Sequence, residues 1–157
     1  MALTDAQYTT LADHIRASSD PDVVAALAIR NDTEITRLYN LDSAVYVWKT
    51  TVTPSEYRGA MVWTQVDQMT AGNARIWEWI TANMTLNLDA SDPNVRQGIL
   101  DAFSGQTLTN LTAVAKRISS LYESLYATGT GTEANPSLLV LEGPLTTQIV
   151  GKALNEF

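Results

Sequence analysis

Apolar residues spaced three and four positions apart dominate the first forty residues and predict three short helices. Thr4 and Gln7 have the spacing of a capping box, which indicates a first helix that begins beside them. Asp20 followed by Pro21 is typical of an N-cap and the first helical position, so a second helix begins there. A second capping-box spacing further along the chain predicts a third helix. We therefore expect a helical head over residues 1–41.

The period changes from helical to two between residues 44 and 52. Val45 and Val47 alternate with Tyr46 and Trp48 in a run rich in β-branched and aromatic residues. Because successive side chains of a strand point to opposite faces, this alternation predicts a short strand.

Helical signals return after this strand. Thr53 can cap a helix whose first residue is Pro54, and Thr70 can cap the next one. Consecutive helical positions lie about 100° apart, so Trp77 and Trp79 cannot both face the core. We expect Trp77 in the core and Trp79 as the candidate for a protein interface.

The longest helical pattern covers residues 108–125, after a shorter helix that begins at Asp92-Pro93. Its apolar positions fit a 3.6-residue period over almost five turns. This pattern places Ile118 on the buried face and Arg117 on the solvated one. We expect one long helix at the centre of the fold, against which the other elements pack.

A flexible arm is expected over residues 128–142, before a last helix that follows Gly143-Pro144. The arm begins with Gly, Thr and other turn-forming residues and ends in an apolar run over 138–141, which predicts a short strand. The candidate partner-contact residues of the chain are large apolar side chains: Trp48, Trp79, Leu138, Leu139, Val140 and Leu141.

These elements predict a mainly α fold. We expect a single-domain helical bundle over 1–157, with a minor β element of short strands near 44–52 and 138–141. With 157 residues, of which 45% are hydrophobic, the chain has enough apolar material for one globular core. No internal repeat and no change of composition separates the parts.

Charge and residue usage exclude several classes of function. The formal net charge of −7 disfavours charge-driven binding to nucleic acid or to an anionic membrane. The chain has no cysteine, and His14 is its single histidine, so we expect no transition-metal site, no cofactor and no catalytic residue. Gly129–Thr132 follows a predicted helix and lacks the lysine that a phosphate-binding loop requires. We therefore interpret it as a mobile connecting loop and not as a phosphate-binding site. No stretch has the length of a membrane span or the pattern of a signal peptide.

Several segments of the sequence resemble a family of small virion proteins of tailed bacteriophages. They are most similar to proteins of the neck, the head-to-tail connectors or adaptors. The resemblance covers roughly residues 44–154 and rests on these segments: Val47–Val52, Ala74–Trp79, Asn94–Ile99, Ala102–Gly105, Leu125–Thr132 and Glu142–Leu145.

This resemblance implies a structural role without catalysis. Such adaptors form rings, usually twelvefold, between the portal protein and the tail, and DNA passes through their lumen. The chain would then be made in the host cytoplasm and reside in the virion neck, in contact with itself, the portal and tail-completion or tail proteins. Three alternatives stay open: a capsid-decoration or tail-completion protein, a small phage-encoded inhibitor or binding module, and an enzyme that uses scattered Asp and Glu residues.

Overall fold

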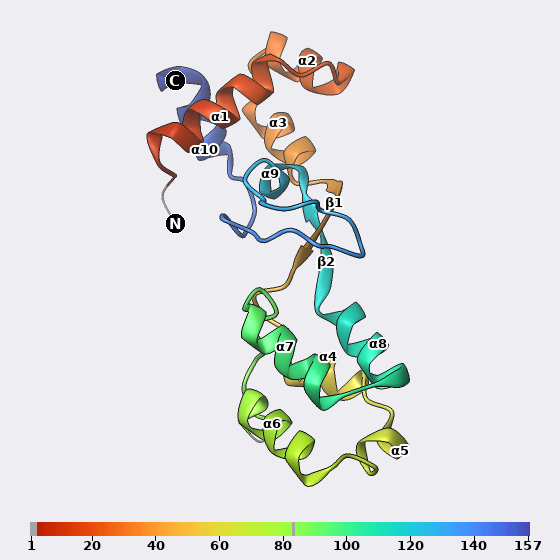
Figure 1. Ribbon diagram of the computed structural model, residues 1–157. Helices are drawn as coiled ribbons and strands as arrows, with labels where there is room; N and C mark the ends of the chain where they lie inside the picture. Colours follow the sequence, from red (N-terminus) through yellow and green to blue (C-terminus); the bar gives the residue numbers. More distant parts are fainter. Residues whose placement is uncertain (1–2, 83) are drawn as a thin grey trace. The chain divides into compact units, whose positions relative to one another are not determined.

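The computed structural model describes residues 3–82 and 84–157 and is mostly helical (Figure 1). Its β structure is one small antiparallel sheet of two strands, β1 (Asp42–Trp48) and β2 (Lys116–Ser120). The expected mainly α fold with a minor β element is therefore confirmed. Its arrangement as one bundle stays a prediction.

The chain packs into two compact units, each made of discontinuous segments. Unit 1 comprises residues 3–45, 118–128 and 139–157, and unit 2 comprises 46–117 and 129–138. The chain passes from unit 1 to unit 2 within β1 and returns within β2. The expected helical head, 1–41, contributes to unit 1, while its role and the expected single domain over 1–157 stay predictions.

Unit 1 is built on a group of packed helices, of which α1 and α3 both contact α10 (Figure 1). Its helices are α1 (Asp5–Arg16), α2 (Pro21–Ala28), α3 (Asp32–Tyr39), α9 (Leu121–Ser124) and α10 (Thr147–Glu156). Fully buried aliphatic side chains from three of them form its core: Leu11 and Ile15 of α1, Ile35 of α3 and Val150 of α10. Burial of these faces supplies the main driving force for packing the helices.

Unit 2 has a core in which aromatic rings meet. Its helices are α4 (Pro54–Gly59), α5 (Trp63–Val66), α6 (Ala71–Thr81), α7 (Pro93–Ala102) and α8 (Gly105–Val114). Trp77 of α6 is buried, as expected, and meets Tyr57 and Phe103 edge to face at centroid distances of 5.5 and 4.8 Å. At Gly98, a Cβ would collide with the Ile80 side chain, so glycine permits the close approach of α7 to α6.

Local capping signals set most helix starts as the sequence predicts. The Thr53 hydroxyl accepts from the Glu56 N–H at 3.3 Å, and the Glu56 carboxylate accepts from the Thr53 N–H at 2.8 Å. The same carboxylate pairs with the Lys49 ammonium at 2.7 Å. The hydrogen bond from Lys49, with further help from Thr53, lowers the pKa of Glu56 to about 2.

The long helix predicted over 108–125 is wrong. α8 ends at Val114, β2 occupies the next segment, and the short helix α9 follows. The backbone of β2 pairs with β1, and the hydroxyls of Ser43 and Ser119 lie 2.9 Å apart beside this pairing. Ile118 is 39% exposed, so its expected place in the core is wrong as well.

The strand predicted over 138–141 is also wrong. Within the run, Leu138 alone is a bridge residue, next to Ser137, which donates to the Tyr46 carbonyl at 2.9 Å and accepts from the Trp48 N–H at 3.0 Å. Nearby, the Gly131 carbonyl accepts from the Tyr46 N–H at 2.8 Å. Residues 131 and 137 of the expected arm, 128–142, thus hydrogen-bond to β1 of their own chain.

Candidate functional site

The outer face of α6 is the candidate site that the structure presents most clearly in unit 2. Thr70 caps the helix by accepting from the Asn73 N–H at 3.2 Å, and burial of Trp77 fixes its inner face. The outer face consists of four residues at spacings i, i+3, i+4 and i+7, which border a hollow of about 320 Å³: Gly72, Arg75, Ile76 and Trp79. We call these four residues the α6 face.

The α6 face has the composition of a protein-binding surface. Trp79 is 82% exposed, which leaves a large aromatic ring in water. Arg75 is exposed too and has no hydrogen bond or ion pair with any residue that the structure describes. Trp and Arg are the residue types that most often carry the energy of protein interfaces. This arrangement can bind an apolar surface that carries negative charge.

A second apolar slot in unit 2 lies beside Trp48 and measures about 160 Å³. The Arg96 guanidinium carbon lies 4.9 Å from the centre of the Trp48 ring, within the range of a cation–π contact. Arg96 Nη1 also donates to the carbonyls of Ala90 and Ser91 at 2.7 Å. These bonds hold the guanidinium in place, and Leu100 lines the same slot. The slot has room for one apolar side chain.

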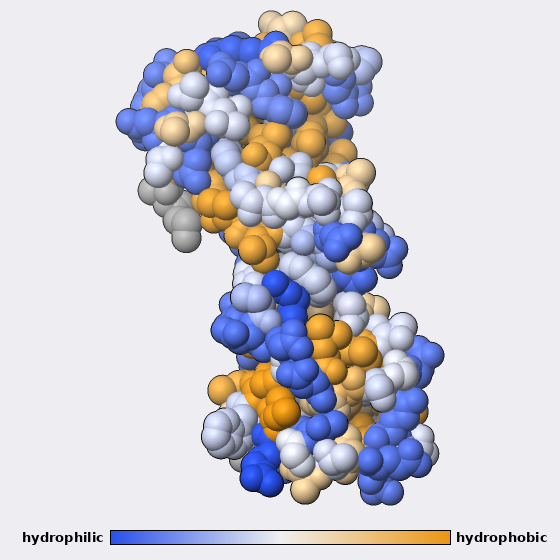
Figure 2. Space-filling view, in the orientation of Figure 1, coloured by the Kyte–Doolittle hydropathy of each residue, from blue (hydrophilic) through white to orange (hydrophobic). Residues whose placement is uncertain are grey.

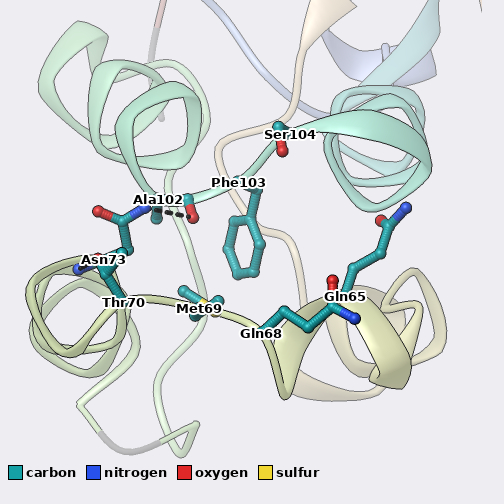
Figure 3. A pocket seen from close by; sticks show the side chains of 8 residues that line it. All are labelled: Gln65, Gln68, Met69, Thr70, Asn73, Ala102, Phe103 and Ser104. Atoms are coloured by element: carbon teal, nitrogen blue, oxygen red, sulfur yellow. Dashed lines mark hydrogen bonds between the residues drawn. The ribbon is translucent and has the colours of Figure 1, made fainter.

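A third hollow, of about 290 Å³, is lined by uncharged residues (Figure 3). Asn73 Nδ2 donates across it to the Ala102 carbonyl at 3.4 Å. Gln65 Oε1 is already used, because it accepts from the N–H and the hydroxyl of Thr107 at 2.9 and 2.7 Å. The side chains that line this hollow include no carboxylate, histidine or other titratable group, so they provide amide hydrogen bonding and no acid–base chemistry.

Unit 1 presents an apolar helix face of its own. The outer side of α2 consists of exposed residues at spacings i, i+3, i+4, i+7 and i+8, which we call the α2 face: Pro21, Val24, Ala25, Ala28 and Ile29. Ile29 directly follows the helix and is 75% exposed, while Val24 is 50% exposed. Figure 2 shows apolar residues interspersed with polar ones where Figure 1 places α2. Exposed Asp20 and Asp22 lie at the N-terminal end of this face.

Charge is distributed unequally between the two units. Unit 1 carries ten acidic and four basic side chains, and unit 2 carries seven acidic and six basic ones. Their formal charges are therefore −6 and −1, and nearly all of the net negative charge belongs to unit 1. Two copies of unit 1 repel each other more than a unit 1 repels a unit 2.

The predicted partner-contact residues lie in different surroundings. Trp48 is half-buried beneath Arg96, and Trp79 is on the α6 face. The run from 138 to 141 divides between the two units: Leu138 belongs to unit 2 and is exposed, while the other three belong to unit 1. Leu139 is half-buried, Val140 is exposed and Leu141 is a core residue of unit 1. Leu141 therefore has little surface to offer to another chain.

His14 lies on the exposed side of α1, as the sequence predicts. Its Nδ1 and the hydroxyl of Tyr39 are 2.7 Å apart, so the pair shares a hydrogen bond. Burial raises the pKa of Tyr39 to about 12, with a smaller contribution from Asp20. Burial thus keeps the Tyr39 hydroxyl neutral, and the contact with His14 keeps it hydrogen-bonded inside unit 1.

In the described part of the chain, no group of three or more His, Cys, Asp or Glu side chains is placed to hold a metal ion. The helices of residues 3–82 and 84–157 include none that is long and apolar enough to cross a bilayer.

The sequence reasoning missed three features of these surfaces: Arg75, Arg96 and the α2 face. A signal existed for two of them. Arg75 lies four residues before Trp79, so both are on one side of a helix. The residues of the α2 face have a helical spacing that begins at Pro21. The pattern is hard to recognise in the sequence because Val23, which is buried, lies among them. Arg96 reaches Trp48 only through tertiary packing, and no local pattern indicates it.

Comparisons with known proteins identify no relative. No protein-family model, no curated protein and no solved structure matches the chain.

Proposed function

We propose that this chain is a structural virion protein of a tailed phage, a head-to-tail connector subunit that docks on the portal and joins it to the tail. The observation that carries the assembly role is the α6 face, where an exposed Trp79 adjoins an Arg75 without a partner in the described residues. The connector role rests on the resemblance of residues 44–154 to phage neck proteins.

An exposed tryptophan supports assembly for an energetic reason. A tryptophan side chain offers 150–250 Å² of surface, and each Å² of its apolar part gains roughly 25 cal/mol when a partner covers it. On a free chain this gain is not realised. The α2 face adds a second unpartnered surface on the other unit, so one chain can contact two neighbours.

The proposed partners are other copies of this chain, the portal protein and tail-completion or tail proteins, with a twelvefold ring as the expected arrangement. The net charge of −7 supports passage of DNA through a lumen, because like charges oppose tight binding to phosphates. In this proposal the chain is made in the host cytoplasm and ends in the virion neck.

Disruption of the gene in the phage that encodes it tests this function. We expect filled heads and separate tails to accumulate, and a plasmid copy of the gene to restore complete particles. A copy with Trp79→Ala should restore at least tenfold fewer infectious particles, since truncation of an interface hot spot costs about 2 kcal/mol or more. A copy with Gln106→Ala, a change at an exposed position of α8, serves as the matched control and should restore particles fully.

The morphology of the defective lysate separates the proposal from its alternatives. Joined heads and tails of reduced stability would contradict the connector role and favour a capsid-decoration protein. Normal particles with altered host physiology would contradict a virion role altogether and favour an inhibitor of a host factor.

A further inference from the structure

We infer that the α6 face of one copy binds the α2 face of a second copy, in a contact that joins unit 2 of one chain to unit 1 of the next. The inference rests on the proposed assembly function and deepens it, because it names the partner of the α6 face. The observation behind it is a pair of complementary, unpartnered helix faces on one chain.

The shapes of the two faces are compatible. α2 has 8 residues and α6 has 11, so at 1.5 Å per residue the helices are about 12 and 16 Å long. Both faces repeat at helical spacing and project aliphatic or aromatic groups. Gly72 has no side chain at one end of the α6 face, and Ala25 and Ala28 are small on the α2 face, so the helix backbones can approach closely.

The charges of the two faces are complementary. The α6 face carries Arg75, whose guanidinium has no partner among the described residues. The α2 face begins beside Asp20 and Asp22, and unit 1 as a whole carries a formal charge of −6. A contact between the α2 face and the α6 face therefore brings Asp20 and Asp22 near Arg75, whereas a contact between two copies of unit 1 opposes like charges.

The contact joins two different surfaces, so a pair keeps one α2 face and one α6 face free, one on each chain, for further copies. Repetition of such a contact closes a ring or extends as a filament, according to the rotation between neighbours. One helix face covers less than the roughly 800 Å² per partner of a standard interface. We therefore expect weak pairwise association that a covalent trap can capture.

The absence of cysteine makes the chain well suited to a disulfide trap. One preparation carries Gly72→Cys and the other Ala25→Cys; a Cβ at residue 72 meets only the Thr70 hydroxyl, at 3.8 Å. When the two are mixed under mild oxidation, the mixed dimer should form at least tenfold faster than either homodimer. The matched control replaces Gly72→Cys by Gly59→Cys, at an exposed glycine where a Cβ meets nothing within 4 Å.

Charge reversal tests the polarity of the contact. Arg75→Glu in the Gly72→Cys chain should slow formation of the mixed dimer about tenfold, and Asp22→Arg in the Ala25→Cys chain should restore it. Both positions are exposed, so near-ultraviolet circular dichroism should show unchanged folding. Failure of Asp22→Arg to restore the dimer would overturn the assignment of these two faces.

The result separates this inference from the proposed function. A mixed dimer no faster than the Gly59→Cys control overturns the inference, even if gene disruption still yields unjoined heads and tails. A fast mixed dimer together with normal particles after gene disruption supports the inference and overturns the connector role.

Discussion

Leu111→Asp should prevent unit 2 from folding, whereas Ile118→Asp should leave both units folded. Leu111 is 1% exposed and belongs to the aromatic core of unit 2, so the substitution buries a charge without a partner. Truncation of a buried leucine alone costs about 2–5 kcal/mol, against a total stability of roughly 5–15 kcal/mol. Ile118 is on β2 and is 39% exposed, so a carboxylate there stays hydrated.

Tryptophan fluorescence reports on unit 2, because all four tryptophans of the chain belong to it, and far-ultraviolet circular dichroism reports on the helices of both units. Leu111→Asp should shift the emission to the wavelength of hydrated indole and abolish the cooperative urea transition. Ile118→Asp should keep the transition, with a loss of about 1 kcal/mol that is typical of a changed strand residue. Equal losses at the two positions would contradict the break between α8 and β2.

Alkaline pH should unfold unit 1 before unit 2, because unit 1 holds the tyrosines whose hydroxyls are most protected. The Tyr39 hydroxyl shares a hydrogen bond with His14, and Tyr126 donates to the Gln7 carbonyl at 2.7 Å. Burial raises the pKa of Tyr39 from 10 to about 12 and raises the pKa of Tyr126 further. The neutral phenols stabilise the fold completely below pH 10, and this contribution is lost as the pH rises through about 12.

Absorbance at the tyrosinate band, followed together with far-ultraviolet circular dichroism, checks this expectation. Ionisation of the buried tyrosines should coincide with a loss of helix signal above pH 10. Tyr39→Phe removes one of the ionising groups, so it should move the alkaline midpoint upward despite the lost hydrogen bond of about 1 kcal/mol. Simple titration of all tyrosines near pH 10 without loss of helix would contradict the burial of these side chains.

The sequence predicts the helix starts well because capping is a local interaction. Thr4, Asp20, Thr53, Thr70 and Asp92 each accept a hydrogen bond from a backbone N–H two or three residues later, as their positions predict. These bonds depend on neighbouring residues alone, so a short stretch of sequence contains all the information that determines them.

The break in the predicted helix over 108–125 has a long-range cause. Apolar spacing there fits a helix, but β2 forms because its backbone pairs with β1, about 70 residues earlier. Apolar periodicity does not report such pairing. One local signal was present: Ser120 and Glu123 form a capping box, which marks the start of α9 and argues against an uninterrupted helix.

The candidate site was predictable only in part. The angular argument separates Trp77 from Trp79 correctly, since their exposed fractions are 4% and 82%. The run at 138–141 could not be resolved in this way, because a short apolar run fits a strand and a core loop equally well. In the structure, Leu141 packs into unit 1, and the pairing with β1 belongs to Ser137.

Localisation of the chain in purified particles tests the connector proposal most directly. A copy with a small C-terminal epitope, bound by a gold-labelled antibody, should place label at the junction of head and tail in electron micrographs. Quantitative mass spectrometry of the same particles should give a fixed number of copies per particle, with twelve as the expected value. Label spread over the capsid surface, or a chain that is abundant in infected cells and missing from purified particles, would contradict the proposal.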